Sequence, residues 1–561
     1  MAPRSKNGDL IMPVVEFSLK DMQRMLKKKI TAKELEEVIL FAKGEVESVE
    51  GDIIKVDIKD TNRPDLWSLE GIARELRAHL GKSGLTDYKV NKSNFRMIVD
   101  KKVEKVRAKT VGAVVKNLHF DDYFIKQIIQ LQEKIHQTYG GNRKFAAIGV
   151  YDFDKIKFPI KYTTVKPDGI KFVPLEFNEE LTPREILAKH PCGLDYGHLI
   201  NQYPEYPLMI DSKSNVLSIP PIINSSYTGK ITEKTRNVFI EITGHELRRI
   251  SIALNVLVTA LAERGGKIYS VEIKYPNEKI IRPDLKPQSF ALDADYTRRL
   301  LGLTLSDKEI IKLLEKSGCK ARPGKKITVD YPAYRDDMMH MRDIVEDIAI
   351  SYGYNKIKPE FPKLSTIGSS DKTEEFCDAV RELMVGLGLQ EIMTFSLTSK
   401  ENLFEKMNIA EENICEISNP VSSNWNVLRN WLLPSLLEFL TNNMHIDYPQ
   451  KIFEVGDCIL LDNSKETKTR NAKKLSAVIT NSEVSYEEIA SVLDAFLSNL
   501  GIKYELRAAV HNSFIEGRSA AVFVNNKEIG IIGEIHPLVL NNWKLEKPVI
   551  AFEMDLNELM Q

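Results

Sequence analysis

The segment that decides the fold of one whole region reads Arg335-Asp336-Asp337-Met338-Met339-His340-Met341-Arg342-Asp343-Ile344-Val345-Glu346-Asp347-Ile348-Ala349-Ile350-Ser351-Tyr352-Gly353-Tyr354. On an α-helix, at about 100° per residue, Asp343, Glu346 and Asp347 fall on one side, and the apolar residues between them fall on the other. Gly353 is typical of the end of such a helix. The segment therefore predicts an amphipathic helix whose polar side is acidic.

Four carboxylates, those of Asp337, Asp343, Glu346 and Asp347, lie close together in this segment. Carboxylate oxygens are the ligands that a hard cation such as Mg2+ prefers. An acidic helix face is also commonly no more than a solvated face, and acids near a helix N-terminus are favourable to the helix dipole. Spacing alone leaves both interpretations open.

Three other blocks of sequence point, with this segment, to one known family. They read Lys59-Asp60-Thr61-Asn62-Arg63-Pro64-Asp65-Leu66-Trp67-Ser68, then Ser218-Ile219-Pro220-Pro221-Ile222-Ile223-Asn224, then Gly517-Arg518-Ser519-Ala520 with Ile532-Gly533-Glu534-Ile535-His536-Pro537. In content and order they resemble the β subunits of phenylalanine–tRNA ligase, and most closely the shorter archaeal and eukaryotic type. The blocks span nearly the whole chain.

The resemblance implies an α+β multidomain fold. We expect an N-terminal module over residues 1–95, a mixed α/β editing domain over 96–276, a winged-helix-like metal-associated domain over 278–358, and a class II ligase-like antiparallel-sheet domain over 366–561. Residues 1–11 match nothing in the family and are interpreted as a possible extension. The resemblance also implies that the four carboxylates of the acidic segment bind Mg2+.

Polar residues on two predicted strands form the second candidate site. In Val238-Phe239-Ile240-Glu241-Ile242-Thr243, alternation places Glu241 and Thr243 on the face opposite the aliphatic residues, and Ser218 alternates in the same way with Leu217 and Ile219. Such positions ordinarily form the wet face of a half-buried strand. The family resemblance instead implies a hydrolytic pocket made by Ser218, Glu241 and Thr243, with Met209 as a wall.

The last predicted domain lacks the motifs of a catalytic class II ligase. Phe453-Glu454-Val455-Gly456 stands where a catalytic domain usually offers Arg-x-Glu, and no Gly-x-Gly-x-x-Arg follows. Arginines that hold ATP phosphates are therefore missing from their usual places, which makes adenylate formation on this chain improbable. We interpret the domain as a scaffold that retains a catalytic fold.

The resemblance implies a division of labour in an α2β2 assembly. The α subunit would join L-phenylalanine to tRNA(Phe) with ATP, while this chain supports it, helps to hold tRNA and hydrolyses mischarged Tyr-tRNA(Phe). Two alternatives stay open, a free-standing hydrolase of mischarged tRNA and a noncatalytic tRNA-binding scaffold.

Composition fits a large soluble component of such an assembly. The 561 residues predict about three to five domains. The 78 basic and 79 acidic side chains argue against a dedicated nucleic-acid coat protein. Five cysteines without Cys-x-x-Cys spacing argue against a disulfide framework or a zinc site. The apolar run 252–262 is too short to span a bilayer and no signal peptide is apparent, so we expect a cytoplasmic protein without membrane contact.

Overall fold

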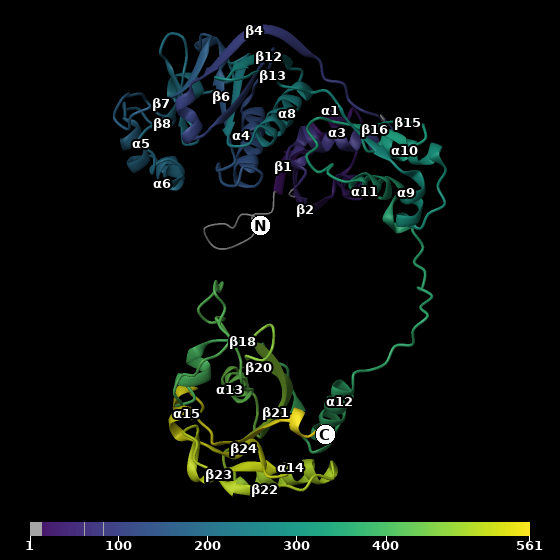
Figure 1. The fold of residues 1–561 in the computed structure, drawn as a ribbon, viewed down its shortest axis with the longest axis vertical. Coiled ribbons are helices and arrows are strands. Elements are labelled where there is room, and N and C mark those ends of the chain that lie inside the picture. The colour runs from purple at the N-terminus through teal and green to yellow at the C-terminus, as the bar shows by residue number, and fades with distance from the viewer. Residues whose placement is uncertain (1–13, 61, 82–83, 561) are drawn as a thin grey trace. The chain divides into compact units, whose positions relative to one another are not determined.

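The computed structural model describes residues 14–60, 62–81 and 84–560 (Figure 1). The chain divides into two compact units, Met1–Glu360 and Phe361–Gln561, called here the N-terminal and C-terminal units. The boundary falls in a segment without helix or strand that contains Pro359 and Pro362. The possible extension at 1–11 lies outside the described residues. Across the part that is described, no helix is both long and apolar enough to cross a membrane.

The N-terminal unit begins with a small antiparallel sheet covered by three helices. The sheet has the strand order β1-β3-β2. Its strands and helices are β1 (Val14–Ser18), β2 (Gly44–Glu50), β3 (Ile53–Ile58), α1 (Leu19–Leu26), α2 (Ala32–Val38) and α3 (Leu69–His79). Ser18, Thr31 and Ser68 cap the three helices, each accepting a backbone N–H with its hydroxyl. Pro64 lies in a separate short turn, Pro64–Leu66, so α3 begins at Leu69.

The second region is a ten-stranded mixed sheet. Its order is β10-β9-β8-β7-β4-β12-β5-β11-β6, with β13 paired to β12. The strands are β4 (Val90–Val99), β5 (Lys109–Lys116), β6 (Ala146–Asp152), β7 (Ile160–Val165), β8 (Tyr206–Ile210), β9 (Val216–Ile219), β10 (Ile223–Asn224), β11 (Val238–Gly244), β12 (Lys267–Lys274) and β13 (Lys279–Arg282). The sheet therefore extends beyond residues 96–276 at both ends.

Helices cover this sheet and fill the connections between its strands. They are α4 (Asp122–Gln137), α5 (Pro183–Lys189), α6 (Pro191–Tyr196), α7 (Ser226–Gly229) and α8 (Leu247–Glu263). The apolar residues of α4 and α8 join the inward residues of β5, β6 and β11 in a hydrophobic core that continues into the N-terminal module. Alternation along β11 is as predicted, because Val238, Ile240 and Ile242 belong to this core and Phe239 belongs to the core on the opposite face.

The third region packs three helices on a three-stranded antiparallel sheet of order β14-β16-β15. Its elements are β14 (Gln288–Leu292), β15 (Lys320–Arg322), β16 (Ile327–Tyr331), α9 (Ala294–Leu301), α10 (Asp307–Lys316) and α11 (Met341–Tyr352). The helix predicted from the acidic segment is α11. It ends at Gly353, whose φ of 98° is a left-handed value that favours glycine.

The C-terminal unit is built on a seven-stranded, largely antiparallel sheet of order β17-β20-β21-β25-β24-β23-β22. Its strands are β17 (Gln390–Glu391), β18 (Leu397–Thr398), β19 (Val427–Leu428), β20 (Gln450–Leu461), β21 (Thr469–Thr480), β22 (Glu505–Ala508), β23 (Phe514–Val524), β24 (Lys527–Ile535) and β25 (Val549–Asp555). Its helices are α12 (Lys372–Gly386), α13 (Leu433–Asn442), α14 (Tyr486–Asn499) and α15 (Pro537–Asn542). Helices α12 and α14 pack on one face of the sheet and α13 on the other, so both faces are buried.

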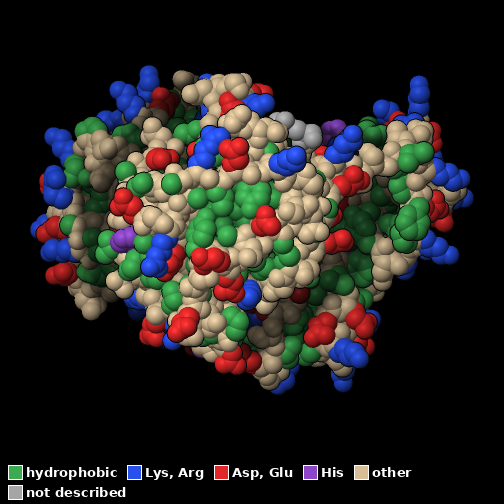
Figure 2. All heavy atoms as spheres, turned by 90° about the horizontal axis from the view of Figure 1, so that it is seen from below, with side chains coloured by type: hydrophobic (Ala, Val, Ile, Leu, Met, Phe, Trp, Pro, Cys, Tyr) green, Lys and Arg blue, Asp and Glu red, His purple; other side chains and the backbone are tan. Residues whose placement is uncertain are grey.

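Acidic and basic side chains are interspersed over the molecular surface shown in Figure 2. This mixture agrees with the near-equal numbers of acidic and basic residues in the chain. No broad surface of one charge is visible on that face, so any contact with RNA phosphates there has to be local.

Candidate functional site

A pocket of about 790 Å³ lies where the two ends of the ten-stranded sheet meet. Edge strand β6 forms one end of the strand order and β10 the other. The sheet curls far enough for Tyr151 of β6 to contact Ser218 of β9 and Asn224 of β10. Helix α4 contributes Ile128 and Gln132 to the lining. The pocket is therefore assembled from segments far apart in the chain.

Glu241 lies at the wall of this pocket on strand β11, next to edge strand β6. Its neighbours across the sheet are Gly112 on β5 and Gly149 on β6. A Cβ atom at position 149 would lie 2.2 Å from the Tyr151 hydroxyl and 2.7 Å from Glu241 Oε1. The missing side chain of Gly149 thus leaves the space that the Glu241 carboxylate and the Tyr151 hydroxyl occupy.

The Tyr151 hydroxyl is the centre of a buried polar cluster. Its oxygen lies 2.7 Å from Ser218 Oγ, 2.9 Å from Glu241 Oε1 and 3.3 Å from Asn224 Oδ1. The Tyr151 hydroxyl has one hydrogen and cannot donate it to all three oxygens at once. The remaining contacts therefore need a hydrogen from the Ser218 hydroxyl or from a protonated Glu241. Among the described residues, Glu241 Oε2 is buried and has no hydrogen-bond partner.

Burial sets the protonation of this cluster. It raises the pKa of Glu241 to about 7, against smaller lowering effects of the Tyr151 hydrogen bond and the Arg107 charge. Burial, together with the neighbouring Glu241 charge, raises the pKa of Tyr151 well above its ordinary value. Near neutral pH Glu241 is therefore close to its titration midpoint while Tyr151 stays a neutral donor.

The structure separates the four residues predicted for the hydrolytic pocket. Ser218 and Glu241 line it, whereas Met209 and Thr243 are not among its described lining residues. Met209 is buried beside Ser218 on the neighbouring strand β8, and Thr243 accepts a hydrogen bond from Arg107 Nε with its hydroxyl. The wet-face interpretation is wrong for these positions, because Ser218 and Glu241 are each only 2% exposed and Thr243 is fully buried.

Sequence reasoning missed Tyr151, Asn224 and Arg143. Arg143 lines the pocket and donates from Nη1 to the Ile222 carbonyl at 2.8 Å, which ties the β6 side to the segment before β10. One signal was available in the sequence. Gly149, inside a strand of otherwise bulky residues, indicates a close approach by another group.

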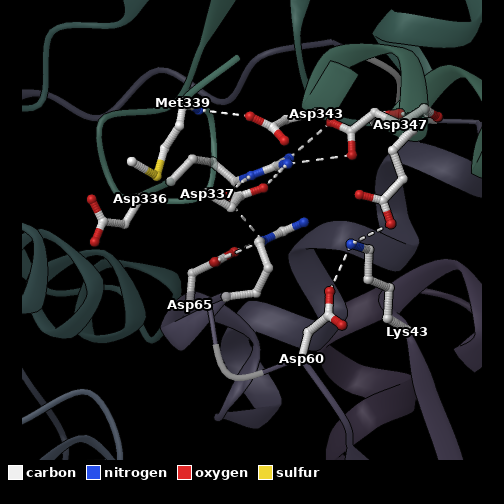
Figure 3. A network of polar contacts seen from close by, with 12 residues as sticks. Lys43, Asp60, Asp65, Asp336, Asp337, Met339, Asp343 and Asp347 are labelled. Carbon is white, nitrogen blue, oxygen red and sulfur yellow. Dashed lines mark hydrogen bonds and ion pairs between the residues drawn. The ribbon is translucent and has the colours of Figure 1, made fainter. Parts of the chain in front are cut away.

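The carboxylates of the acidic segment lie in a network of ion pairs between the N-terminal module and the third region (Figure 3). Arg335 donates to Asp337 at 2.8 Å and to Asp347 at 3.1 Å. Asp343 caps its own helix by accepting the backbone N–H groups of Met339 and His340. Glu346 forms an ion pair with Lys43 at 3.0 Å. Each of the four carboxylates therefore has a partner within the protein, and Asp337 and Asp347 share Arg335.

A second arginine extends this network into the N-terminal module. Arg63 is 2% exposed and donates to Asp65 and Glu75, each at 2.9 Å, and its Nε lies 3.9 Å from Asp337 Oδ1. Burial alone would raise the pKa of Asp337, but the Arg335 charge and hydrogen bonds hold it well below its usual range. Burial raises the pKa of Asp347 in spite of Arg335.

Two expectations about the acidic segment are wrong. Asp347 does not share an exposed face with Asp343 and Glu346, because it is 4% exposed and turned toward Arg335. The four carboxylates do not converge on one point either, and within the described ranges no group of three or more His, Cys, Asp or Glu side chains is placed to hold a metal ion. Their oxygens suit Mg2+ in type, but the four are not arranged as one site.

Three family models match the chain in successive regions. A B3/4 domain matches residues 98–270, a tRNA synthetase B5 domain matches residues 290–354, and a phenylalanyl tRNA synthetase beta chain CLM domain matches residues 357–556. Residues 98–270 hold the pocket and residues 290–354 hold the acidic segment.

Relatives match over nearly the full length. The phenylalanine–tRNA ligase beta subunit of Pyrococcus abyssi is 51% identical over 98% of this chain and 100% of its own length. That of Methanocaldococcus jannaschii is 41% identical over 97% of this chain and 100% of its own length. A crystal structure of an N-terminal fragment of the Pyrococcus horikoshii beta subunit is 48% identical, with a TM-score of 0.60, and covers 61% of this chain and 100% of the fragment. This chain belongs to the family of phenylalanine–tRNA ligase β subunits.

Proposed function

We propose that the pocket at Glu241 hydrolyses tyrosine wrongly attached to tRNA(Phe), while phenylalanine is activated and transferred on an α subunit with which this chain forms an α2β2 assembly. One observation carries the proposal. Glu241 Oε2 is a buried acceptor without a partner at the wall of a pocket of about 790 Å³. A buried oxygen of this kind favours a ligand that brings a hydroxyl donor.

Selection against tyrosine needs a second site. An apolar pocket that fits phenylalanine rejects an added hydroxyl group only weakly. A site with a buried acceptor favours tyrosine over phenylalanine, because phenylalanine has no hydroxyl group and leaves that acceptor unpaired. Tyr-tRNA(Phe) is then bound by Glu241 and Phe-tRNA(Phe) is not.

Hydrolysis itself requires water at the ester carbonyl. Water adds to the carbonyl carbon, the bond to the terminal ribose oxygen breaks, that oxygen takes up a proton, and free tyrosine is released. Ser218 has Tyr151 beside its hydroxyl and no histidine among its described hydrogen-bond partners, so it lacks the base that a serine nucleophile needs. We assign Ser218 and Tyr151 to positioning the substrate or water. Met209 and Thr243 support the strands behind them.

The C-terminal unit supplies a reason to place activation on the partner. Arg429 is the buried arginine nearest to Glu454, and its guanidinium donates to Glu454 at 2.7 Å, to the Thr394 hydroxyl at 2.7 Å and to the Asp457 carbonyl at 3.0 Å. The N–H groups with which Arg429 could hold ATP phosphates are therefore already donated to acceptors within the protein.

We propose two Mg2+ ligands in place of the four carboxylates predicted from the sequence. Asp337 and Asp347 are committed to Arg335, whereas Glu346 is 49% exposed and Asp343 is half-buried. Mg2+ commonly binds through one or two carboxylates and keeps several waters. We therefore place any Mg2+ at Asp343 and Glu346, with Asp337 and Asp347 fixing the loop and helix that carry them.

A pair of assays tests the proposed function. The full chain with its α partner should deacylate Tyr-tRNA(Phe) much faster than Phe-tRNA(Phe), and equal rates would exclude editing. The chain alone should show no phenylalanine-dependent ATP–pyrophosphate exchange, which should appear when the α subunit is added. Exchange by the isolated chain would contradict the division of labour. Deacylation without any binding to an α subunit would favour a free-standing hydrolase, and loss of deacylation altogether would favour a scaffold.

A further inference from the structure

A second, smaller pocket of about 330 Å³ lies beside the first and carries positive charge. Its lining includes the cationic or titratable side chains of Arg107, Lys144, His198 and His245. No aspartate or glutamate is among its described lining residues. This contrasts with the mixture of charges on the face shown in Figure 2 and indicates a place that favours an anion.

Arg107 gives this pocket a buried positive charge. Its side chain is 2% exposed and donates to the Thr243 hydroxyl at 2.9 Å and to the backbone carbonyls of Arg143 and Lys144, each at 3.0 Å. All of these acceptors are neutral, and within the described residues Arg107 forms no ion pair with a carboxylate. Burial lowers the pKa of Arg107 to about 10, as expected for a charge without a close counter-ion. A bound anion would supply that counter-ion.

The exposed side chains above Arg107 add to the same field. Lys144 and His198 are exposed at the mouth of the pocket. Burial, and then the charges of Arg107 and Lys144, lower the pKa of His245. The positive charges of Arg107 and Lys144 therefore have no carboxylate partner among the described residues that line the pocket.

Neighbouring positions of the chain contribute to the two pockets. Arg143 lines the first pocket and the next residue, Lys144, lines the second. On the other side, Glu241 lines the first pocket, and Thr243, two residues further along the same strand, is held by Arg107 of the second. Consecutive Cα atoms lie about 3.8 Å apart, so one segment of the chain contributes adjacent residues to both pockets.

We propose that this second pocket binds a phosphodiester of the tRNA 3′ end while the amino acid ester at that end occupies the first pocket. The inference rests on the proposed function and adds to it a subsite formed by Arg107, Lys144, His198 and His245. Phosphate contacts fix the register of a nucleic acid without reading its sequence. The pocket would thus set how deeply the terminal ribose enters and where its ester lies relative to Ser218 and Glu241.

Two substrates separate this subsite from the hydrolytic pocket. Tyr-tRNA(Phe) has both the tyrosyl ester and the phosphodiesters, whereas 3′-O-tyrosyl-adenosine has the ester alone. The variant is Lys144→Gln combined with His198→Gln, which changes two exposed side chains and leaves buried Arg107 in place. The matched control is Lys92→Gln, an exposed lysine elsewhere on the same sheet. All are assayed as the full chain with its α partner.

The expected result is a selective loss. The double variant should raise KM for Tyr-tRNA(Phe) by about 10-fold, as expected when charged groups that bind phosphate are removed. Its activity on tyrosyl-adenosine, which has no phosphodiester, should not change. The slope of log KM against log salt concentration should also fall by about 0.7 for each single-strand phosphate that the variant no longer binds. The control should match the wild type.

Three results would overturn the inference. The first is a double variant that matches the control on Tyr-tRNA(Phe), and the second is an equal loss on both substrates, which would indicate a structural defect. The third is a wild type that hydrolyses neither substrate, which would remove the proposed function and this subsite with it. Loss on the tRNA substrate alone, with activity on tyrosyl-adenosine intact, supports the subsite.

Discussion

At the scale of single residues, the raised pKa of Glu241 makes the stability of the fold depend on pH. Its pKa of about 7 in the fold compares with 4.5 for an exposed glutamate, so the folded chain binds its proton more tightly than the unfolded chain does. The stabilisation from that proton is fully present below pH 4.5 and is lost as the pH rises through about 7, a change of about 3 kcal/mol. Above that pH the fold carries a buried charge.

Because the wild type loses stability as Glu241 ionises, a neutral side chain at this position should be favoured at high pH. Glu241→Gln keeps the shape of the side chain and removes its charge, so it should raise Tm relative to the wild type at pH 8 and have little effect at pH 5. Thermal unfolding of the two proteins at both pH values measures the difference. Exposed Glu246→Gln serves as the control and should not alter Tm at either pH. A Glu241→Gln effect of the same size at both pH values would contradict a raised pKa.

At the scale of elements, Arg335 fixes two carboxylates within the third region, and one of them, Asp337, faces Arg63 of the N-terminal module. Arg335 is 3% exposed and faces Asp337 and Asp347, both of which are largely buried. Removing one partner from a buried network leaves the others uncompensated, which costs about 3–5 kcal/mol. Arg335→Met should therefore lower the unfolding temperature of the N-terminal unit markedly. Arg342→Met, at an exposed arginine of α11, should leave it nearly unchanged. Similar effects of the two changes would show that the network is not stabilising.

The same helix carries the proposed Mg2+ position. Asp343→Asn combined with Glu346→Gln should abolish Mg2+ binding measured by equilibrium dialysis of the assembled enzyme, because these are the accessible carboxylates. Glu315→Gln on neighbouring helix α10 is the control and should retain the wild-type metal content. Unchanged metal content in the double variant would show that Asp343 and Glu346 do not bind Mg2+ and serve only in helix capping and ion pairing.

The sequence predicts elements better than it predicts partners. Alternation in β11 correctly assigned Glu241 and Thr243 to one face, and Gly353 marked the end of α11. Alternation could not show that both faces of β11 are buried or that Tyr151 reaches Glu241 from the next strand, since these depend on how distant segments pair. Helical spacing likewise could not place Arg335 against Asp347. The winged-helix-like description of residues 278–358 stays a prediction.

At the scale of the whole molecule, the two units have different proposed tasks. The N-terminal unit contains both pockets, while the C-terminal unit is a sheet with helices on both faces whose buried arginine, Arg429, is already engaged by Glu454. On the proposed division of labour, editing residues lie in the N-terminal unit and the charging site lies on the α subunit, so substitutions in the editing pocket should leave charging intact.

The most direct test of these assignments measures selectivity in deacylation. The ratio of kcat/KM for Tyr-tRNA(Phe) to that for Phe-tRNA(Phe) is determined for the assembled wild type and for Glu241→Ala, with phenylalanine charging measured alongside. Removing the acceptor for the tyrosine hydroxyl should lower the ratio by about 10- to 100-fold, which corresponds to about 1.5–3 kcal/mol, and leave charging intact. A ratio that stays at the wild-type value in Glu241→Ala would contradict the central claim that this buried carboxylate recognises the mischarged amino acid.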